Sequence, residues 1–127
     1  MTPEPPRITG LHFAEPQRAQ PADLALLTDQ LLQEATERPN GLRTKAIIQG
    51  PLQQAVLFAL RAGAQLPEHD SPPAATLQVL RGQVVLVAGE ERWRLAKGSL
   101  LPIPPVRHHV DAVTDAVCLL TICRGEG

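Results

Sequence analysis

The sequence has no tyrosine, and its aromatic residues are Phe13, Phe58 and Trp93. A core short of aromatic rings has to be filled with leucine, valine, isoleucine and alanine. The 127 residues carry twelve basic and thirteen acidic side chains, so the basic excess of a nucleic-acid-binding protein is missing. The chain also lacks an apolar run of the roughly eighteen residues that a membrane-spanning helix needs. We therefore expect one domain with neither a nucleic-acid nor a membrane partner.

Cysteine is also scarce, since Cys118 and Cys123 are the two in the chain. In a strand-like segment they face opposite sides and lie too far apart for a disulfide bond. We therefore expect both cysteines to be buried and reduced, as in a cytoplasmic protein. The amino-terminal segment lacks the basic start and apolar run of a signal peptide, which also favours a cytoplasmic location.

Prolines, in contrast, are abundant at thirteen of 127 residues. Prolines interrupt helices and suit short strands joined by corners. Residues 1–21 combine several prolines with little periodicity, which predicts an extended arm. Residues 22–38 are predicted to form a helix because apolar side chains recur at helical spacing, and Pro39-Asn40-Gly41 ends it.

From residue 42 the pattern changes to short β-rich segments separated by turn residues such as Gly50-Pro51 and Arg81-Gly82. The predicted strands cover 44–49, 54–61, 76–80, 84–88, 92–95, 100–103, 109–113 and 117–122. Short strands with regular breaks are typical of a jelly roll. The segments 84–87 and 118–120 are apolar on both faces, so one face should fill the barrel and the other must be covered.

Two stretches, 63–82 and 98–113, hold the residues that can carry chemistry. Three residues are spaced along each stretch: Gly63, His69 and Gly82 in the first, and Gly98, Pro104 and His109 in the second. At these spacings the chain resembles the two motifs of the cupin family, in its small single-domain form, over about 42–124. The resemblance implies an all-β fold: a cupin-type double-stranded β-helix, or jelly-roll barrel, with one N-terminal helix.

The resemblance to metal-binding cupins is incomplete. Those proteins take two histidines and a glutamate from the first motif, whereas Ser71 and Ala75 stand here at the second histidine and the glutamate. His69 and His109 are the ligand positions that are kept, but a catalytic zinc site generally has three protein ligands. The resemblance implies Fe, Ni, Mn or Zn if a divalent metal is bound.

The alternation of side chains along a strand predicts the same site independently of the resemblance to cupins. In an extended strand, His69, Ser71 and Ala75 face one side, while Glu68 and Asp70 face the other. We expect His109 to join this interior row from a facing strand, with His108 turned the opposite way. The predicted ligand pocket is apolar with a few polar contacts. Its residues are His69, Ser71, His109, Phe58, Leu77 and Val79.

Three interpretations stay open on this evidence. The first is a cupin that binds a small molecule beside a degenerate metal centre, with the histidines as hydrogen-bonding or proton-transfer groups. The second is a metal-dependent cupin enzyme, such as a dioxygenase, isomerase or lyase, that uses His69 and His109. The third is a non-catalytic dimeric scaffold. We also expect a homodimer formed through the apolar strand faces.

Overall fold

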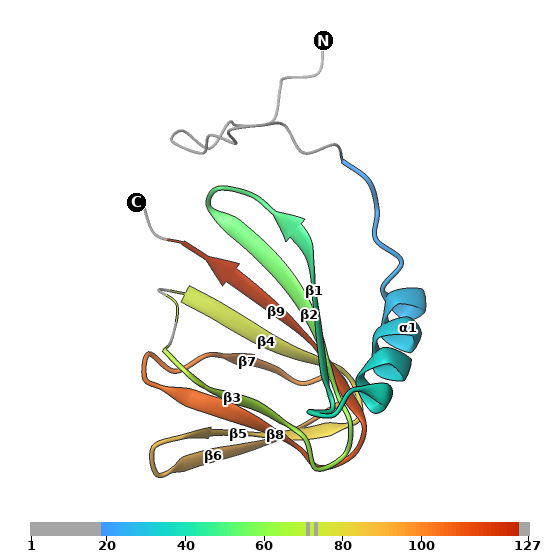
Figure 1. The fold of residues 1–127 in the computed structure, drawn as a ribbon. Coiled ribbons are helices and arrows are strands. Elements are labelled where there is room, and N and C mark those ends of the chain that lie inside the picture. Colours follow the sequence, from blue (N-terminus) through green and yellow to red (C-terminus); the bar gives the residue numbers. More distant parts are fainter. Residues whose placement is uncertain (1–18, 71, 73, 125–127) are drawn as a thin grey trace.

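A helix and nine strands make up the described part of the computed structural model, residues 19–70, 72 and 74–124 (Figure 1). The helix α1 covers Leu24–Glu37, and the strands are β1 (Leu42–Gln49), β2 (Gln53–Leu60), β3 (Gln65–His69), β4 (Ala74–Arg81), β5 (Gln83–Ala88), β6 (Glu91–Ala96), β7 (Leu100–Pro102), β8 (His108–Ala112) and β9 (Ala116–Cys123). Most of the predicted arm, 1–21, lies outside the described residues, as does Ser71.

The helix begins two residues later than predicted, because Asp23 caps it. The Asp23 carboxylate accepts a hydrogen bond from the backbone N–H of Leu26 at 3.1 Å, which satisfies one of the unpaired N–H groups of the first turn. At the other end, the Arg61 guanidinium donates to the carbonyl oxygens of Thr36 and Arg38 at 3.1 and 3.0 Å. A cation is favourable at the negative end of the helix dipole.

The strands form two antiparallel sheets, which confirms the all-β cupin-type prediction. One sheet has the order β1-β2-β9-β4-β7 and the other the order β3-β8-β5-β6. The strand β3 was not predicted. It contains Pro67 and lies at a sheet edge, where a missing N–H does not interrupt a ladder. The continuous strand assumed for 69–75 was wrong, since β3 ends at His69 and β4 begins at Ala74.

The main core lies between the two sheets and is almost entirely aliphatic. Phe58 is the one aromatic side chain among its fully buried members in the described chain, and Trp93 packs at the margin. The other buried members are Leu60, Leu77, Val79, Val84, Leu86, Ala88, Leu95, Val110, Ala112, Ala116 and Cys118. Aliphatic side chains therefore fill the core, as the shortage of aromatic residues predicts.

A second core lies outside the barrel, between α1 and the outer face of the five-stranded sheet (Figure 1). Leu31 and Ala35 of α1 pack there with Leu57, Ala59 and Val117. Leu119 packs against the same cluster, so the helix covers part of the apolar outer face of β9. The helix therefore covers part of the apolar strand face that was expected to lie in a homodimer interface.

The two cysteines differ in exposure. Cys118 is buried in the main core, as predicted, whereas Cys123 at the end of β9 is exposed, and both are free thiols. Within the residues that the structure describes, no helix is long and apolar enough to cross a membrane.

Candidate functional site

The interior of the barrel is more exposed at one end than at the other. Along β2, Phe58 is buried whereas Val56 and Gln54, which face the same side, are half-buried. The same change occurs along β9, from Cys118 to Leu120 and Ile122. Figure 1 shows the two sheets diverging toward the side where β3 leads into β4. We call this the open end, and define it by the inward residues Gln54, Val56, Ala75, Leu120 and Ile122.

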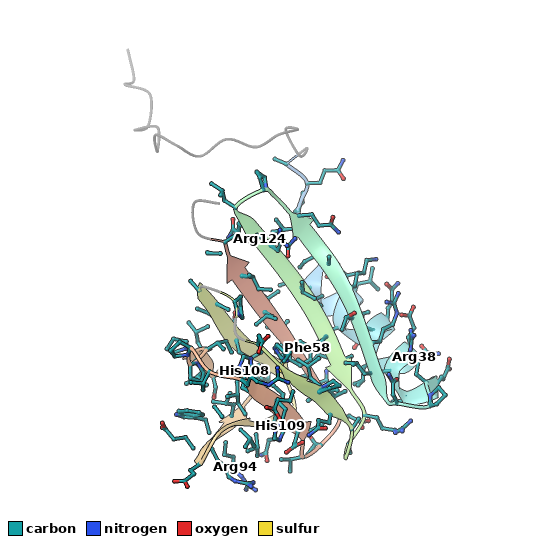
Figure 2. The ribbon with its side chains drawn as sticks, turned by 60° about the vertical axis from the view of Figure 1, so that its left-hand side comes forward. Arg38, Phe58, Arg94, His108, His109 and Arg124 are labelled. Carbon is teal, nitrogen blue, oxygen red and sulfur yellow. The ribbon has the colours of Figure 1, made fainter. Side chains whose placement is uncertain are left out.

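Two histidines meet at the open end. His69 is the last residue of β3 and His108 the first of β8, and the antiparallel pairing places them directly opposite each other. Their ring centroids are 4.3 Å apart with an interplanar angle of 69°, an edge-to-face contact. His108 is 2% exposed, whereas His69 is half-buried. In the view of Figure 2, His108 is seen below Arg124, which follows β9, and above Arg94 of β6.

Both imidazoles are held through the same nitrogen. Nδ1 of His69 lies 2.8 Å from the carbonyl oxygen of Pro67, and Nδ1 of His108 lies 2.9 Å from that of Val106. A carbonyl oxygen only accepts hydrogen bonds, so each Nδ1 must carry the proton. In the neutral rings, Nε2 is therefore the lone-pair nitrogen of both His69 and His108.

Burial keeps His108 neutral. Desolvation lowers the pKa of this imidazole, because the charged form loses water, and the neighbouring rings of His69 and His109 lower it further. The bond to the Val106 carbonyl acts in the opposite direction and is outweighed. At neutral pH the His108 ring is therefore an uncharged group with a hydrogen-bond acceptor.

The structure reverses the expected orientation of the adjacent histidines. His109 was expected to face the interior, but it lies on the outer face of β8, where its Nε2 is 3.3 Å from Asp111 Oδ2. The reason is packing: Val110 and Ala112 are 2% and 5% exposed in the core, and alternation turns His108 inward with them. The sequence carried this signal, since apolar Val110 and Ala112 alternate with polar Asp111.

An ion-pair cluster on the surface joins the strands that carry the two histidines. Arg107 Nε lies 3.0 Å from Glu68 Oε1, and Arg107 Nη1 lies 2.8 Å from Asp70 Oδ1. The hydrogen bond to Glu68 and then that to Asp70 raise the pKa of the Arg107 guanidinium. All three side chains are exposed, so this cluster links the end of β3 to the start of β8 from outside.

The other predicted pocket residues lie deeper in the barrel or outside the described chain. Phe58, Leu77 and Val79 are each 1% exposed and belong to the main core. Phe58 and Val79 stand one inward position further from the open end than Val56 and Leu77. Ser71 lies outside the described residues, so its predicted contact with a ligand stays a prediction.

The donor set at the histidine pair does not fit a resident catalytic metal. The bond from each Nδ1 to a carbonyl suits a metal-binding histidine, whose second nitrogen is usually held in this way. However, the part of the chain that the structure describes contains no group of three His, Cys, Asp or Glu side chains that would hold a metal ion. The nearby carboxylates of Glu68 and Asp70 are bound to Arg107. Two imidazoles alone fall short of the usual three protein ligands.

A separate open groove lies outside the barrel, where α1 meets the five-stranded sheet. It has a volume of about 290 Å³. It is lined by Leu24, Ala25, Thr28, Leu80, Arg81 and Lys97. This groove has no signal in the sequence, because it arises from the packing of α1 on residues distant in the sequence.

With this architecture, the chain has the fold of the small cupins. No protein-family model and no curated protein matches the sequence, but many solved structures match the fold. A cupin superfamily protein from Desulfitobacterium hafniense is 18% identical, with a TM-score of 0.68 over 91% of this chain and 100% of that one. An RmlC-like cupin from Desulfovibrio desulfuricans is 28% identical, with a TM-score of 0.60 over 65% of this chain and 81% of that one.

An enzyme also shares this fold. Salicylate 1,2-dioxygenase from Pseudaminobacter salicylatoxidans is 19% identical to the chain, with a TM-score of 0.64. The match covers 76% of this chain but 32% of the dioxygenase. At this level of identity the likeness concerns the barrel alone.

Proposed function

We propose that the protein is a small-molecule-binding cupin whose ligand occupies the open end and contacts the His69–His108 pair. The observation that carries the proposal is the contact of the two rings, 4.3 Å between centroids, inside the barrel. Small-molecule sites are mostly apolar and contain a few polar groups that fix the orientation of the ligand. Half-buried Val56, Leu120 and Ile122 supply the apolar wall in this proposal.

The proposal treats the histidine pair as a polar anchor without a resident metal. A metal-dependent enzyme is the second candidate, and the carbonyl bond at each Nδ1 favours it. The fold shared with a salicylate 1,2-dioxygenase adds to that candidate. The number of ligands favours the metal-free site. A homodimer, the dimeric scaffold and a cytoplasmic location stay predictions.

The test is to block the open end and measure ligand binding. Methyl NMR spectra of the protein are recorded with a collection of small molecules. We expect bound molecules to shift the methyl signals of Val56, Leu120 and Ile122. Ile122→Trp should abolish these shifts because the indole fills the open end. Ile48→Trp is the matched control, since Ile48 is 42% exposed. Ligands that bind Ile122→Trp as well as the unchanged protein would contradict the proposal.

Metal titration separates the two candidates. Calorimetric titration with Zn²⁺ and with Fe²⁺ under anaerobic conditions should show no tight binding of one equivalent. The second candidate predicts tight binding that His69→Phe removes and His109→Phe leaves intact, because His109 lies on the outer face. That result would replace the metal-free proposal with the metal-dependent one.

A further inference from the structure

We propose that the open end selects ligands that place a hydrogen-bond donor on the His69–His108 pair, as an aliphatic alcohol or amine does, and that it discriminates against carboxylates. The inference rests on the proposed function and adds the chemical class of the ligand. It depends on which nitrogen of each ring carries the proton, and on what surrounds the two rings.

The backbone fixes the proton positions. The carbonyl oxygens of Pro67 and Val106 lie 2.8 and 2.9 Å from the Nδ1 atoms of His69 and His108. Each Nδ1 has to donate to its carbonyl, so each neutral ring has a lone pair and no proton at Nε2. Two acceptor nitrogens therefore belong to rings whose centroids are 4.3 Å apart. Such a pair is complementary to O–H or N–H groups.

A carboxylate is the wrong partner for two such acceptors. An ionised carboxylate has acceptor oxygens only, so it can bind the pair only if a ring takes up a second proton. Protonation is disfavoured because the His108 ring is 2% exposed and lies against a second imidazole. Burying an unpaired carboxylate there would also leave its charge without compensation.

The aliphatic side chains of the open end indicate what kind of body the rest of the ligand has. On the five-stranded sheet, the inward side chains of the open end include aliphatic Val56, Leu120 and Ile122, together with the polar Gln54. The chain has no tyrosine and only three aromatic residues. Val56, Leu120 and Ile122 are aliphatic, so a planar ligand cannot stack on an aromatic ring of this wall. A compact saturated body therefore fits the site better than an aromatic ring.

The test uses three probes that share one saturated ring: cyclohexanol, cyclohexylamine and cyclohexanecarboxylate. Dissociation constants are measured by methyl NMR titration at about pH 8, where neutral imidazole predominates. We expect the alcohol and the amine to bind about tenfold more tightly than the carboxylate, the effect of one hydrogen bond gained or lost. Comparison of the alcohol with the amine shows whether a positive charge adds to the binding.

Two variants and one spectrum serve as controls. His69→Phe keeps a ring of similar shape but removes one of the two acceptors, so it should weaken the preference. If the phenylalanine variant does not fold, His69→Gln is used instead, because its amide can also donate to a carboxylate. His109→Phe should keep the preference, because His109 lies on the outer face. Long-range ¹H–¹⁵N spectra of the unliganded protein report the protonated nitrogen of each ring directly.

The outcomes separate this inference from the proposed function. A carboxylate that binds as tightly as the alcohol would overturn the inference and leave the proposed function intact. A spectrum that shows a proton on Nε2 of either neutral ring would also overturn it. If none of the probes shifts the methyl signals of Val56, Leu120 or Ile122, the inference fails together with the proposed site.

Discussion

The two ends of the barrel are built from the same strands but differ in packing and chemistry. At the closed end, defined by Phe58, Leu60, Val79, Ala116 and Cys118, every inward side chain is at most 1% exposed. Burial there raises the pKa of the Cys118 thiol to about 12, so this cysteine is not a nucleophile. At the open end, Gln54, Val56, Ala75, Leu120 and Ile122 are half-buried, and two imidazoles, half-buried His69 and buried His108, replace aliphatic groups.

The difference shows how a single core can support both stability and binding. A close-packed interior has no room for a ligand, and its side chains contribute most of the free energy of folding. Side chains that are half-buried contribute less and stay accessible to another molecule. The strands β2, β4 and β9 run through both regions, so the closed end holds the open end in place.

The largest expected effect comes from truncating one residue at each end of β2. Phe58→Ala should lower the free energy of unfolding by about 3–5 kcal/mol, because it leaves a cavity in the closed end. Val56→Ala, two residues away on the same face, should cost about 1 kcal/mol because Val56 is only half-buried. Urea unfolding of both variants measures the two values. Equal losses would show that the ends do not differ in packing.

Two turn glycines offer a second comparison between the ends. Gly82 and Gly89 have φ angles of +78° and +61°, so alanine costs about 1–2 kcal/mol at either position from backbone strain. At Gly82, next to the closed end, an added Cβ would lie 2.0 Å from the carbonyl oxygen of Asp115. The clash should add about 1–3 kcal/mol. At Gly89 the Cβ would meet nothing within 4 Å.

Urea unfolding of Gly82→Ala and Gly89→Ala measures this difference. Backbone strain lowers the free energy of unfolding by a similar amount in both variants. The difference between the two losses therefore measures the clash with the Asp115 carbonyl at the closed end. A larger loss of stability in Gly89→Ala than in Gly82→Ala would contradict this prediction, because the added Cβ at Gly89 meets nothing within 4 Å.

The pH dependence of stability is the third way to test the open end. Because burial lowers the pKa of His108 in the folded protein, the unfolded chain binds more protons below the usual histidine pKa of about 6.5. Stability should therefore be complete above about pH 6.5 and fall as the pH decreases toward the folded-state pKa. Urea unfolding at several pH values measures this, and NMR titration of the His108 ring identifies the group. Stability that rises as the pH falls through this window would contradict the assignment.

The closed end was the more predictable of the two from the sequence. Its turn glycine Gly82 and the alternating apolar residues of its strands are local signals, and they gave the barrel and its aliphatic core. The open end depends on register, and there the motif spacing pointed to His109. The alternation of Val110, Asp111 and Ala112 instead turns His108 inward. The strand β3 was missed because Pro67 weakens its pattern, so the partner strand of His108 was not predicted.

The smallest expected effect on stability concerns the ion pairs of Arg107. This guanidinium holds Glu68 and Asp70 at 3.0 and 2.8 Å, but all three side chains are exposed. Water and salt screen such pairs, so Arg107→Gln should change the free energy of unfolding little or not at all. Its effect should instead be local, because the pairs join the end of β3 to the start of β8 beside the two rings.

Nuclear Overhauser contacts between the His69 and His108 rings provide the measurement for this variant. We expect them to weaken in Arg107→Gln and, in the unchanged protein, at high salt, while the signals of the closed end stay as they were. Arg94→Gln is the control, an exposed arginine on β6. If Arg107→Gln unfolded the barrel, the open end would be part of the main stabilising core, and the contrast between the two ends would not hold. If the ring contacts were unchanged, strand pairing alone would position the histidines.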